Sequence, residues 1–308
     1  MKKGLLRGLL IVLFWVGLGL CVYAVAKYWH EARQLLVGIG WSGGVVAAVL
    51  LAGAWWLAVE SWRMSVLAYS DRAIGRGEAA RHLALLLLGK YIPGGIWGFA
   101  ARLADSSSGR AVPGMVAAGL FEQWGGLASI CVLSAALWSA AKFGWPVLIC
   151  SLAAPPLILL GWRCGRFILA AAAEKVPYRW KSLIQDVVDK PTSKLRRASV
   201  CIALQQAVQM LAIVWLASAA NDLPISAAAG LAACYGLAIA VGLVAVFAPG
   251  GMLVREATFV ALSSPWVGYA DAIAFSAVMR LVFTCFDLLA GGLAAALGLA
   301  SKALSSKG

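Results

Sequence analysis

Charged residues are scarce in this 308-residue sequence, since Asp, Glu, Lys and Arg together make up only 13% of it. Hydrophobic residues account for 62%, and the mean hydropathy is +0.87. A soluble globular domain carries about 25% charged residues, so this composition excludes an ordinary soluble fold. It predicts an all-α protein that crosses a membrane several times.

Histidine is nearly absent, and the two that occur, His30 and His82, lie outside the long apolar stretches. This argues against a histidine-based catalytic centre but leaves a carboxylate-based one open. Cys-x-x-Cys pairs, Cys/His metal spacings, nucleotide-binding phosphate loops and serine-hydrolase or zinc-protease motifs are all missing. We therefore expect no cofactor, no metal and no enzyme activity, and we interpret the seven cysteines as reduced apolar side chains.

Among the few charged residues, basic ones predominate, with 26 Lys and Arg against 13 Asp and Glu. They cluster between the apolar tracts, where the positive-inside rule explains them better than nucleic-acid binding would. We therefore expect cytoplasmic loops that face anionic lipid, and no nucleic-acid partner.

Six apolar tracts are close to the ~20 residues that a membrane-spanning helix needs. They cover residues 5–26, 37–60, 112–140, 146–162, 199–219 and 272–300. The first tract follows Lys2 and Lys3 and precedes Ala24-Val25-Ala26, which is also the pattern of a cleavable signal peptide. Its length favours an uncleaved first span.

The distribution of basic residues predicts the orientation. Lys2, Lys3 and Arg7 place the N-terminus in the cytoplasm, and Lys302 and Lys307 place the C-terminus there. The loop 163–198 carries nine basic residues and is the clearest cytoplasmic segment. We expect a multi-pass protein of the cell membrane, which in a bacterium is the inner membrane.

Two further apolar tracts, 83–103 and 225–262, are each interrupted by Pro-Gly-Gly. Proline removes a backbone donor, and paired glycines let the chain reverse. Pro249 follows Pro93 by about half the length of the chain. Broken tracts in corresponding places of two halves indicate a transporter-type site.

The loop charges predict that the two broken tracts are re-entrant hairpins that enter the membrane from opposite faces. Residues 1–140 and 146–300 then form two inverted membrane repeats, each with one hairpin. The alternative is that residues 225–247 cross the membrane completely, which would destroy this symmetry.

A helix that begins after such a break presents unpaired backbone N–H groups, which suit a phosphate or carboxylate. Residues 96–102 and 252–262 would be such half-helices, with Lys90, Arg102 and Arg255 beside them. The alternative is that both breaks only allow close helix packing.

Ionisable residues inside apolar tracts are costly, and they are usually paired or functional. Arg280 and Asp287 are seven residues apart on one predicted helix and so share a face. We expect Arg255 and Arg280 to attract a lipid phosphate, while Glu122, Glu256 and Asp287 hold those arginines or exchange protons. Purely structural ion pairs are the alternative, as for Glu60 and Arg63 near a span end. The expected substrate-binding residues are Lys90, Tyr91, Pro93, Gly94, Gly95, Trp97, Arg102, Glu122, Pro249, Gly250, Gly251, Arg255, Glu256, Arg280 and Asp287.

The segments Lys90-Tyr91-Ile92-Pro93-Gly94-Gly95-Ile96-Trp97 and Pro249-Gly250-Gly251, with Val254-Arg255-Glu256, resemble the lysylphosphatidylglycerol synthase transmembrane, or flippase-like, family. The resemblance covers most of the chain. It implies lipid translocation by a stand-alone member, because the aminoacyl-transfer domain of the synthases is absent. Leu253 stands where family members often have a glycine, which predicts a less open backbone there.

Our first hypothesis is a translocator, not driven by ATP, for a lipid with an anionic or phosphate-bearing headgroup. An aminoacylated phospholipid or a polyprenyl-phosphate sugar would fit. An integral-membrane glycosyl- or lipid-modifying enzyme, or an accessory scaffold of such a pathway, is the alternative. The expected partners are a membrane lipid and an enzyme of a lipid or glycolipid pathway.

Overall fold

The computed structural model describes residues 23, 26–70, 72–90, 97–105, 112–144, 151–173, 185, 188, 192–221, 223–245, 251 and 253–305. These residues form nine α-helices and no β-strand, which confirms the predicted all-α fold. The α-helices are α2 (Trp29–Ser70), α3 (Arg76–Gly89), α4 (Trp97–Asp105), α5 (Val112–Phe143), α6 (Ala154–Ala173), α8 (Arg196–Asn221), α9 (Ile225–Val244), α10 (Val254–Ser263) and α11 (Tyr269–Ser305), with a 3₁₀ turn, η3 (Thr192–Leu195), before α8. The helix α2 is broken at Gly40.

Five stretches are long and apolar enough to cross a membrane, as judged by length and composition. They are Trp29–Ser70, Gly114–Phe143, Ser193–Ala220, Ile225–Val244 and Tyr269–Ala294. Four of them contain most of the predicted spans 37–60, 112–140, 199–219 and 272–300. The predicted first span, 5–26, lies almost entirely outside the described residues.

The predicted span 146–162 differs from the structure, in which α6 covers Ala154–Ala173. Two prolines follow Ala154 in the first turn, where a missing backbone N–H costs little. The helix then continues through Arg163, where the loop 163–198 was expected to begin. Basic residues do not end a helix, because a long side chain carries its charge to the helix surface. The helix α6 is therefore longer at this end than the predicted apolar span, whose membrane boundary stays a prediction.

The first broken tract forms two short helices, α3 and α4, that pack side by side. A Cβ atom added to Gly98, near the start of α4, would lie 2.7 Å from the carbonyl oxygen of Leu86, near the end of α3. At the other end of the pair, Arg81 donates a hydrogen bond to Asp105 over 2.5 Å. The two helices are therefore antiparallel and make a helical hairpin. The connection, residues 91–96, lies outside the described residues.

The second broken tract forms α9 and α10, which are also antiparallel. Near the end of α9, a Cβ atom on Gly251 would lie 2.9 Å from the backbone of Gly242. Trp266, just after α10, lies directly against Gly230 in the first half of α9. This is the two-armed arrangement predicted for 225–262, although α9 alone is long enough to cross a membrane.

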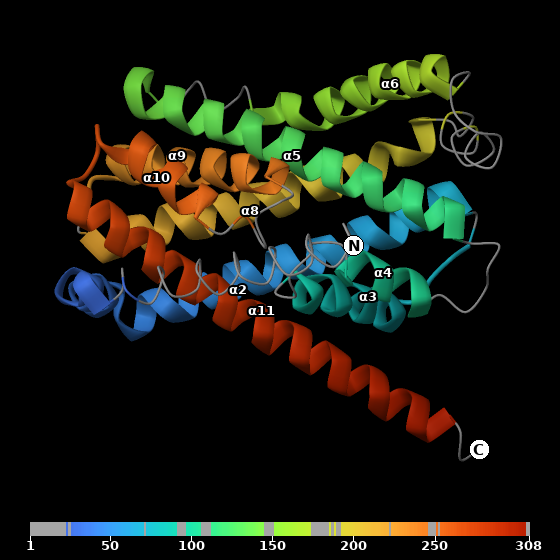
Figure 1. The fold of residues 1–308 in the computed structure, drawn as a ribbon, viewed down its shortest axis with the longest axis horizontal. Helices are drawn as coiled ribbons and strands as arrows, with labels where there is room; N and C mark the ends of the chain where they lie inside the picture. Colours follow the sequence, from blue (N-terminus) through green and yellow to red (C-terminus); the bar gives the residue numbers. More distant parts are fainter. Residues whose placement is uncertain are drawn as a thin grey trace, which may run out of the picture.

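The two hairpins enter the helix bundle from opposite ends (Figure 1). In that view α2 runs to the right and the α3/α4 hairpin enters from the right, whereas α8 runs to the left and the α9/α10 hairpin enters from the left. The two long helices that precede the hairpins, α2 and α8, pack together. Each hairpin packs against the long helix that follows the other one, so α3 contacts α11 and α9 contacts α5.

Each hairpin is supported by its own apolar core. Around the second hairpin, the ring of Tyr235 lies 5.5 Å from that of Phe259, and Phe259 stacks on Phe275 at 5.5 Å. Beside the first hairpin, Trp162 packs edge-on against Phe121 with ring centroids 5.3 Å apart. The rings of Tyr235, Phe259 and Phe275 join α9, α10 and α11, whereas Trp162 and Phe121 join α6 to α5 in the core that α3 also contacts.

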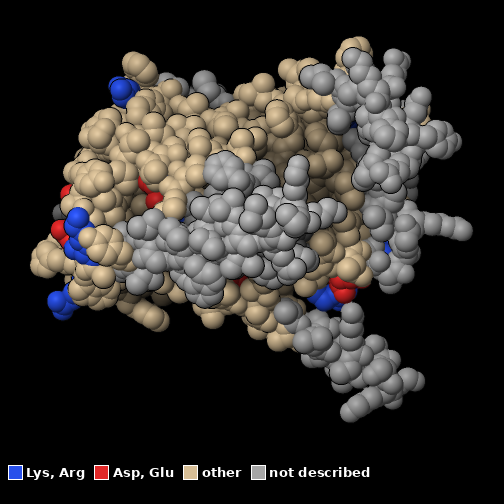
Figure 2. Space-filling model, viewed as in Figure 1, with Lys and Arg blue, Asp and Glu red and all other residues tan. Residues whose placement is uncertain are grey.

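The described surface in Figure 2 is mostly uncharged between the two ends of the bundle, and most of the visible charged side chains lie toward those ends. Such a distribution is typical of a protein whose middle faces lipid and whose ends face water.

Candidate functional site

A cavity of about 830 Å³ lies where the two hairpins meet the long helices. Lys90 and Gly98, on either side of the first break, belong to its wall, as do Ala245 and Gly251 beside the second break. The long helices contribute their middle portions, within residues 51–58 of α2, 122–130 of α5, 205–209 of α8 and 280–287 of α11. Described residues that flank both breaks therefore line one common space at mid-height of the bundle.

The cavity wall is mainly apolar, with a limited set of polar side chains. Its charged members are Lys90, Glu122, Arg255, Arg280 and Asp287. Its uncharged polar members are Gln123, Gln205, Gln206, Gln209, Thr284 and the indole of Trp55. A few polar groups in an apolar surround are typical of a ligand site.

The first charged pair on the wall joins the two halves of the chain. Lys90, at the end of α3, donates a hydrogen bond to the carboxylate of Asp287 on α11. The side chain of Lys90 keeps 41% of its surface exposed because it faces the cavity. Arg280 and Asp287 share the cavity-facing side of α11, as their spacing predicted, but Asp287 holds a lysine rather than an arginine.

The second charged group lies at the start of α10. Glu256 accepts a hydrogen bond from Arg280 and lies 3.6 Å from Nε of Arg255. The guanidinium of Arg255 is also 5.3 Å from the ring centroid of Tyr235, within cation–π range. With Lys90 and Asp287, this part of the site holds three cations and two carboxylates, so it carries one net positive charge.

Only one member of the third charged pair, Glu122, reaches the cavity. Arg102 on α4 donates to Glu122 on α5 over 2.8 Å, and its side chain is only 1% exposed. Its guanidinium lies 3.1 Å from the ring centroid of Trp62. Arg102 was expected to contact a ligand, but in the described structure it lies behind Glu122, which alone of the pair reaches the cavity wall.

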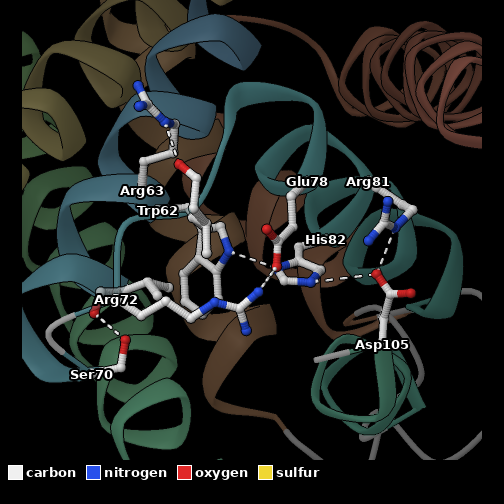
Figure 3. A network of polar contacts seen from close by, with 10 residues as sticks. Trp62, Arg63, Ser70, Arg72, Glu78, Arg81, His82 and Asp105 are labelled. Atoms are coloured by element: carbon white, nitrogen blue, oxygen red, sulfur yellow. Dashed lines mark hydrogen bonds and ion pairs between the residues drawn. The ribbon is translucent and has the colours of Figure 1, made fainter. Parts of the chain in front are cut away.

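A buried polar network at the base of the first hairpin joins Trp62, His82 and Asp105 (Figure 3). Trp62 Nε1 donates to Nδ1 of His82 over 3.2 Å. The indole nitrogen can only donate, so Nδ1 must be the unprotonated nitrogen and Nε2 carries the proton. Nε2 lies 3.4 Å from Asp105, which also accepts from Arg81.

The environment of His82 keeps this histidine neutral. Its side chain is fully buried. Burial and then the charge of Arg102 lower the pKa of His82 from 6.5 to about 4, although Asp105 acts in the opposite direction. Because His82 lies in a polar-flanked stretch of sequence, its burial was not predicted.

The backbone at the start of α10 adopts a conformation that normally requires glycine. Gly251 has a φ of 69°, and Leu253 has a φ of 67° although it carries a Cβ atom. Leucine at this position was expected to make the backbone of the second half-helix less open, and this stays a prediction. The ψ of Leu253 is −43°, and this sparsely populated conformation costs about 1–3 kcal/mol in a residue with a Cβ atom. No side chain caps the α10 N-terminus.

The glutamines are the site residues that the sequence-based prediction missed. Gln205, Gln206 and Gln209 form a Gln-Gln-x-x-Gln segment inside a predicted span. Polar residues at this spacing in an apolar helix are a detectable signal, but attention to charged side chains alone passes over them.

Several predicted site residues cannot be related to the cavity. Tyr91, Pro93, Gly94, Gly95, Pro249 and Gly250 lie outside the described residues. Trp97 begins α4, but its side chain is also outside the description.

Comparison with known proteins leaves the family open. No family model, curated protein or solved structure matches the chain. The resemblance of the two Pro-Gly-Gly segments to flippase-like proteins therefore stays a prediction.

Proposed function

We propose that this protein translocates a lipid with an anionic, phosphate-bearing headgroup across a membrane. The observation that carries the proposal is one cavity that is lined by described residues from the flanks of both chain breaks and holds an excess of cations. Lys90, Arg255 and Arg280 face a mainly apolar wall at mid-height of the bundle. These three cations outnumber the two carboxylates beside them, Asp287 and Glu256, and the net positive charge attracts a phosphate.

The proposed topology is an inverted repeat with two re-entrant hairpins. It is supported by the opposite directions of the α3/α4 and α9/α10 hairpins (Figure 1) and by the exchanged packing of α3 on α11 and α9 on α5. Sites of transporters with inverted repeats lie near the membrane midplane, where interrupted helices meet. In this arrangement each hairpin separates the cavity from one side of the membrane.

The proposed orientation places both termini in the cytoplasm. The end of the bundle where α2 meets α3 and where α8 begins carries several basic side chains, including Arg72, Arg76, Arg196 and Arg197. At the opposite end, basic residues are balanced by Glu31 and Asp271. The positive-inside rule then assigns the basic end to the cytoplasm.

The carboxylates favour translocation over the alternative of a membrane enzyme. Both carboxylates on the wall are engaged, Glu122 with Arg102 and Asp287 with Lys90. A general base needs a carboxylate that can take a proton from its substrate. Carboxylates that hold basic side chains instead set the geometry and net charge of a binding site.

A vesicle assay tests the proposal. The purified protein is reconstituted into phosphatidylcholine vesicles with a trace of acyl-NBD-phosphatidylglycerol, and dithionite is added outside. Protein-free vesicles should lose about half of the fluorescence, whereas a translocator exposes the inner leaflet too. We expect Arg255→Gln and Arg280→Gln to slow this loss by roughly tenfold or more, since hydrogen bonds to charged groups contribute about 1.5–3 kcal/mol.

The matched control is Arg76→Gln. Arg76 also pairs with a glutamate, Glu60, but its side chain is 63% exposed and outside the cavity. This variant should translocate like the wild type. The proposal fails if the folded wild type bleaches no further than protein-free vesicles, or if both cavity variants are as fast as Arg76→Gln.

A further inference from the structure

An uncharged polar wall lies beside the charged part of the cavity. Gln205, Gln206 and Gln209 line the cavity from α8, and Gln123 lines it from α5. The spacing i, i+1, i+4 places the three α8 residues on one side of that helix. All of them lie in the middle of a stretch apolar enough to span a membrane, Ser193–Ala220. An amide at such a depth costs free energy unless it is hydrogen-bonded.

Two atoms of this wall lack such a bond. The Oε1 atom of Gln206 is buried and has no hydrogen-bond partner among the described residues, and the same holds for the Nε1 atom of Trp55 on α2. One is an acceptor and the other a donor, and both residues belong to the cavity wall. Buried polar atoms in native proteins are nearly always paired, and both of these atoms would gain a partner if their side chains turned toward a ligand in the cavity.

The chemistry of the wall matches hydroxyl groups. An amide offers both donors and an acceptor, and a hydroxyl group likewise donates and accepts. A phosphate only accepts, and an ammonium group only donates, so neither satisfies a row of amides. The charged side chains come from other elements, namely the end of α3, α10 and α11. The cavity volume, about 830 Å³, is in the range that holds a whole small-molecule ligand rather than a bare phosphate.

We propose that Gln123, Gln205, Gln206 and Gln209 form a subsite for a polyhydroxylated headgroup, a sugar or a cyclic polyol attached to the lipid phosphate. This inference rests on the translocation proposal, since it assumes that the phosphate lies on the cations. The inference adds a binding site for the part of the headgroup beyond the phosphate. The glutamine wall distinguishes hydroxyl-rich headgroups from choline or ethanolamine, while the cations accept any lipid phosphate.

Binding of three short-chain probes to the detergent-solubilised full-length protein tests this. Dihexanoyl phosphatidylinositol carries phosphate and polyol, dihexanoyl phosphatidylethanolamine carries phosphate and ammonium, and dihexanoyl phosphatidic acid carries phosphate alone. The wild type should bind the inositol lipid at least tenfold more tightly than the ethanolamine lipid. The double variant Gln205→Leu/Gln209→Leu should lose that tenfold preference and keep its affinity for phosphatidic acid. Leucine suits an apolar helix, and unchanged unfolding temperature verifies the fold.

The matched control is Gln34→Leu, a glutamine of α2 outside this cavity that hydrogen-bonds His30. It should bind all three probes like the wild type. Equal affinity of the wild type for the inositol and ethanolamine lipids would overturn the inference, as would equal losses for inositol lipid and phosphatidic acid in the double variant. Failure of the translocation proposal is separately visible, because Arg280→Gln would then leave phosphatidic acid binding unchanged.

Discussion

Each of the two hairpin regions contains an Arg–Glu ion pair between the hairpin and the long helix that follows it. The two pairs differ in how far they are exposed. In the first, Arg102 of the hairpin pairs with Glu122 of the following long helix. In the second, Glu256 of the hairpin pairs with Arg280 of the following long helix, so the signs are exchanged. The side chain of Arg102 is 1% exposed, whereas those of Glu256 and Arg280 are both 19% exposed.

This difference in exposure separates structural from ligand-accessible charge. The guanidinium of Arg102 is covered by Trp62, and its carboxylate partner is the only member of the pair on the cavity wall. Arg280 lies on that wall itself, and Glu256 has a second cation, Arg255, 3.6 Å away. A fully enclosed cation can support the fold but cannot contact a ligand. Where two cations share one carboxylate, as Arg255 and Arg280 share Glu256, one of the cations can bind a ligand instead.

The largest expected effect separates these two pairs by stability. Arg102→Met leaves Glu122 without its buried cation and should lower the free energy of unfolding by about 3–5 kcal/mol. Arg280→Met should cost clearly less, since Glu256 keeps Arg255 nearby. Unfolding temperatures in detergent measure both. Equal losses would show that the two regions are not different in kind.

A double variant sharpens the same comparison. Replacement of both partners, Arg102→Met with Glu122→Leu, removes the uncompensated charge and should recover most of the lost stability. If the double variant were as unstable as Arg102→Met alone, the loss would come from packing around Trp62 rather than from charge.

The next effect concerns pH and tests whether the first region is sealed. The pKa of His82 is about 4 in the fold against an ordinary 6.5, so between these values the unfolded state binds more protons. Stability is therefore complete above about pH 6.5 and falls as pH drops toward 4, by up to about 3 kcal/mol. His82→Gln, which keeps an acceptor for Trp62, should flatten this part of the profile.

The control for the pH profile is His30→Gln, because His30 lies on the exposed face of α2. Denaturant unfolding of the three proteins from pH 4 to pH 7 gives the slopes. If the wild type and His82→Gln had the same slope, His82 would be accessible to protons, and the first region would be open like the second.

The smallest expected effect concerns the backbone of the second region. Leu253→Gly should raise the stability by about 1 kcal/mol, because glycine adopts the observed φ of 67° without a Cβ clash. Gly251→Ala should have the opposite sign, since its φ is 69° and a Cβ atom would lie 2.9 Å from Gly242. Unfolding temperatures of both variants provide the measurement. A destabilised Leu253→Gly would mean that the leucine side chain contributes more than the strain costs.

Local chemistry explains which parts of the fold were predictable. The tracts 112–140, 199–219 and 272–300 were located correctly because lipid demands a minimum apolar length. The helix α6 continues past Arg163, where the loop was expected to begin, because a helix can carry arginines on its surface. The breaks were found because proline and glycine act on the backbone within a few residues.

The residues of the candidate site were likewise predictable only in part. A charged residue inside or beside an apolar tract can be recognised from the sequence alone. For this reason the prediction included Lys90, Arg255, Arg280 and Asp287. The glutamines were missed because an amide is a weaker signal. Neither the pairing of Lys90 with Asp287 nor the exclusion of Arg102 from the cavity could be predicted, since both depend on residues distant in the chain.

The sequence by itself therefore determined an all-α chain with long apolar helices and two backbone breaks, because these follow from composition and from neighbouring residues. Only the tertiary structure decided that the surroundings of both breaks share one cavity, and which arginine faces it. The physical reason is that burial of a charge depends on how helices from both halves pack. Packing sets the exposure of Arg102 and of Arg280, and sequence spacing sets neither.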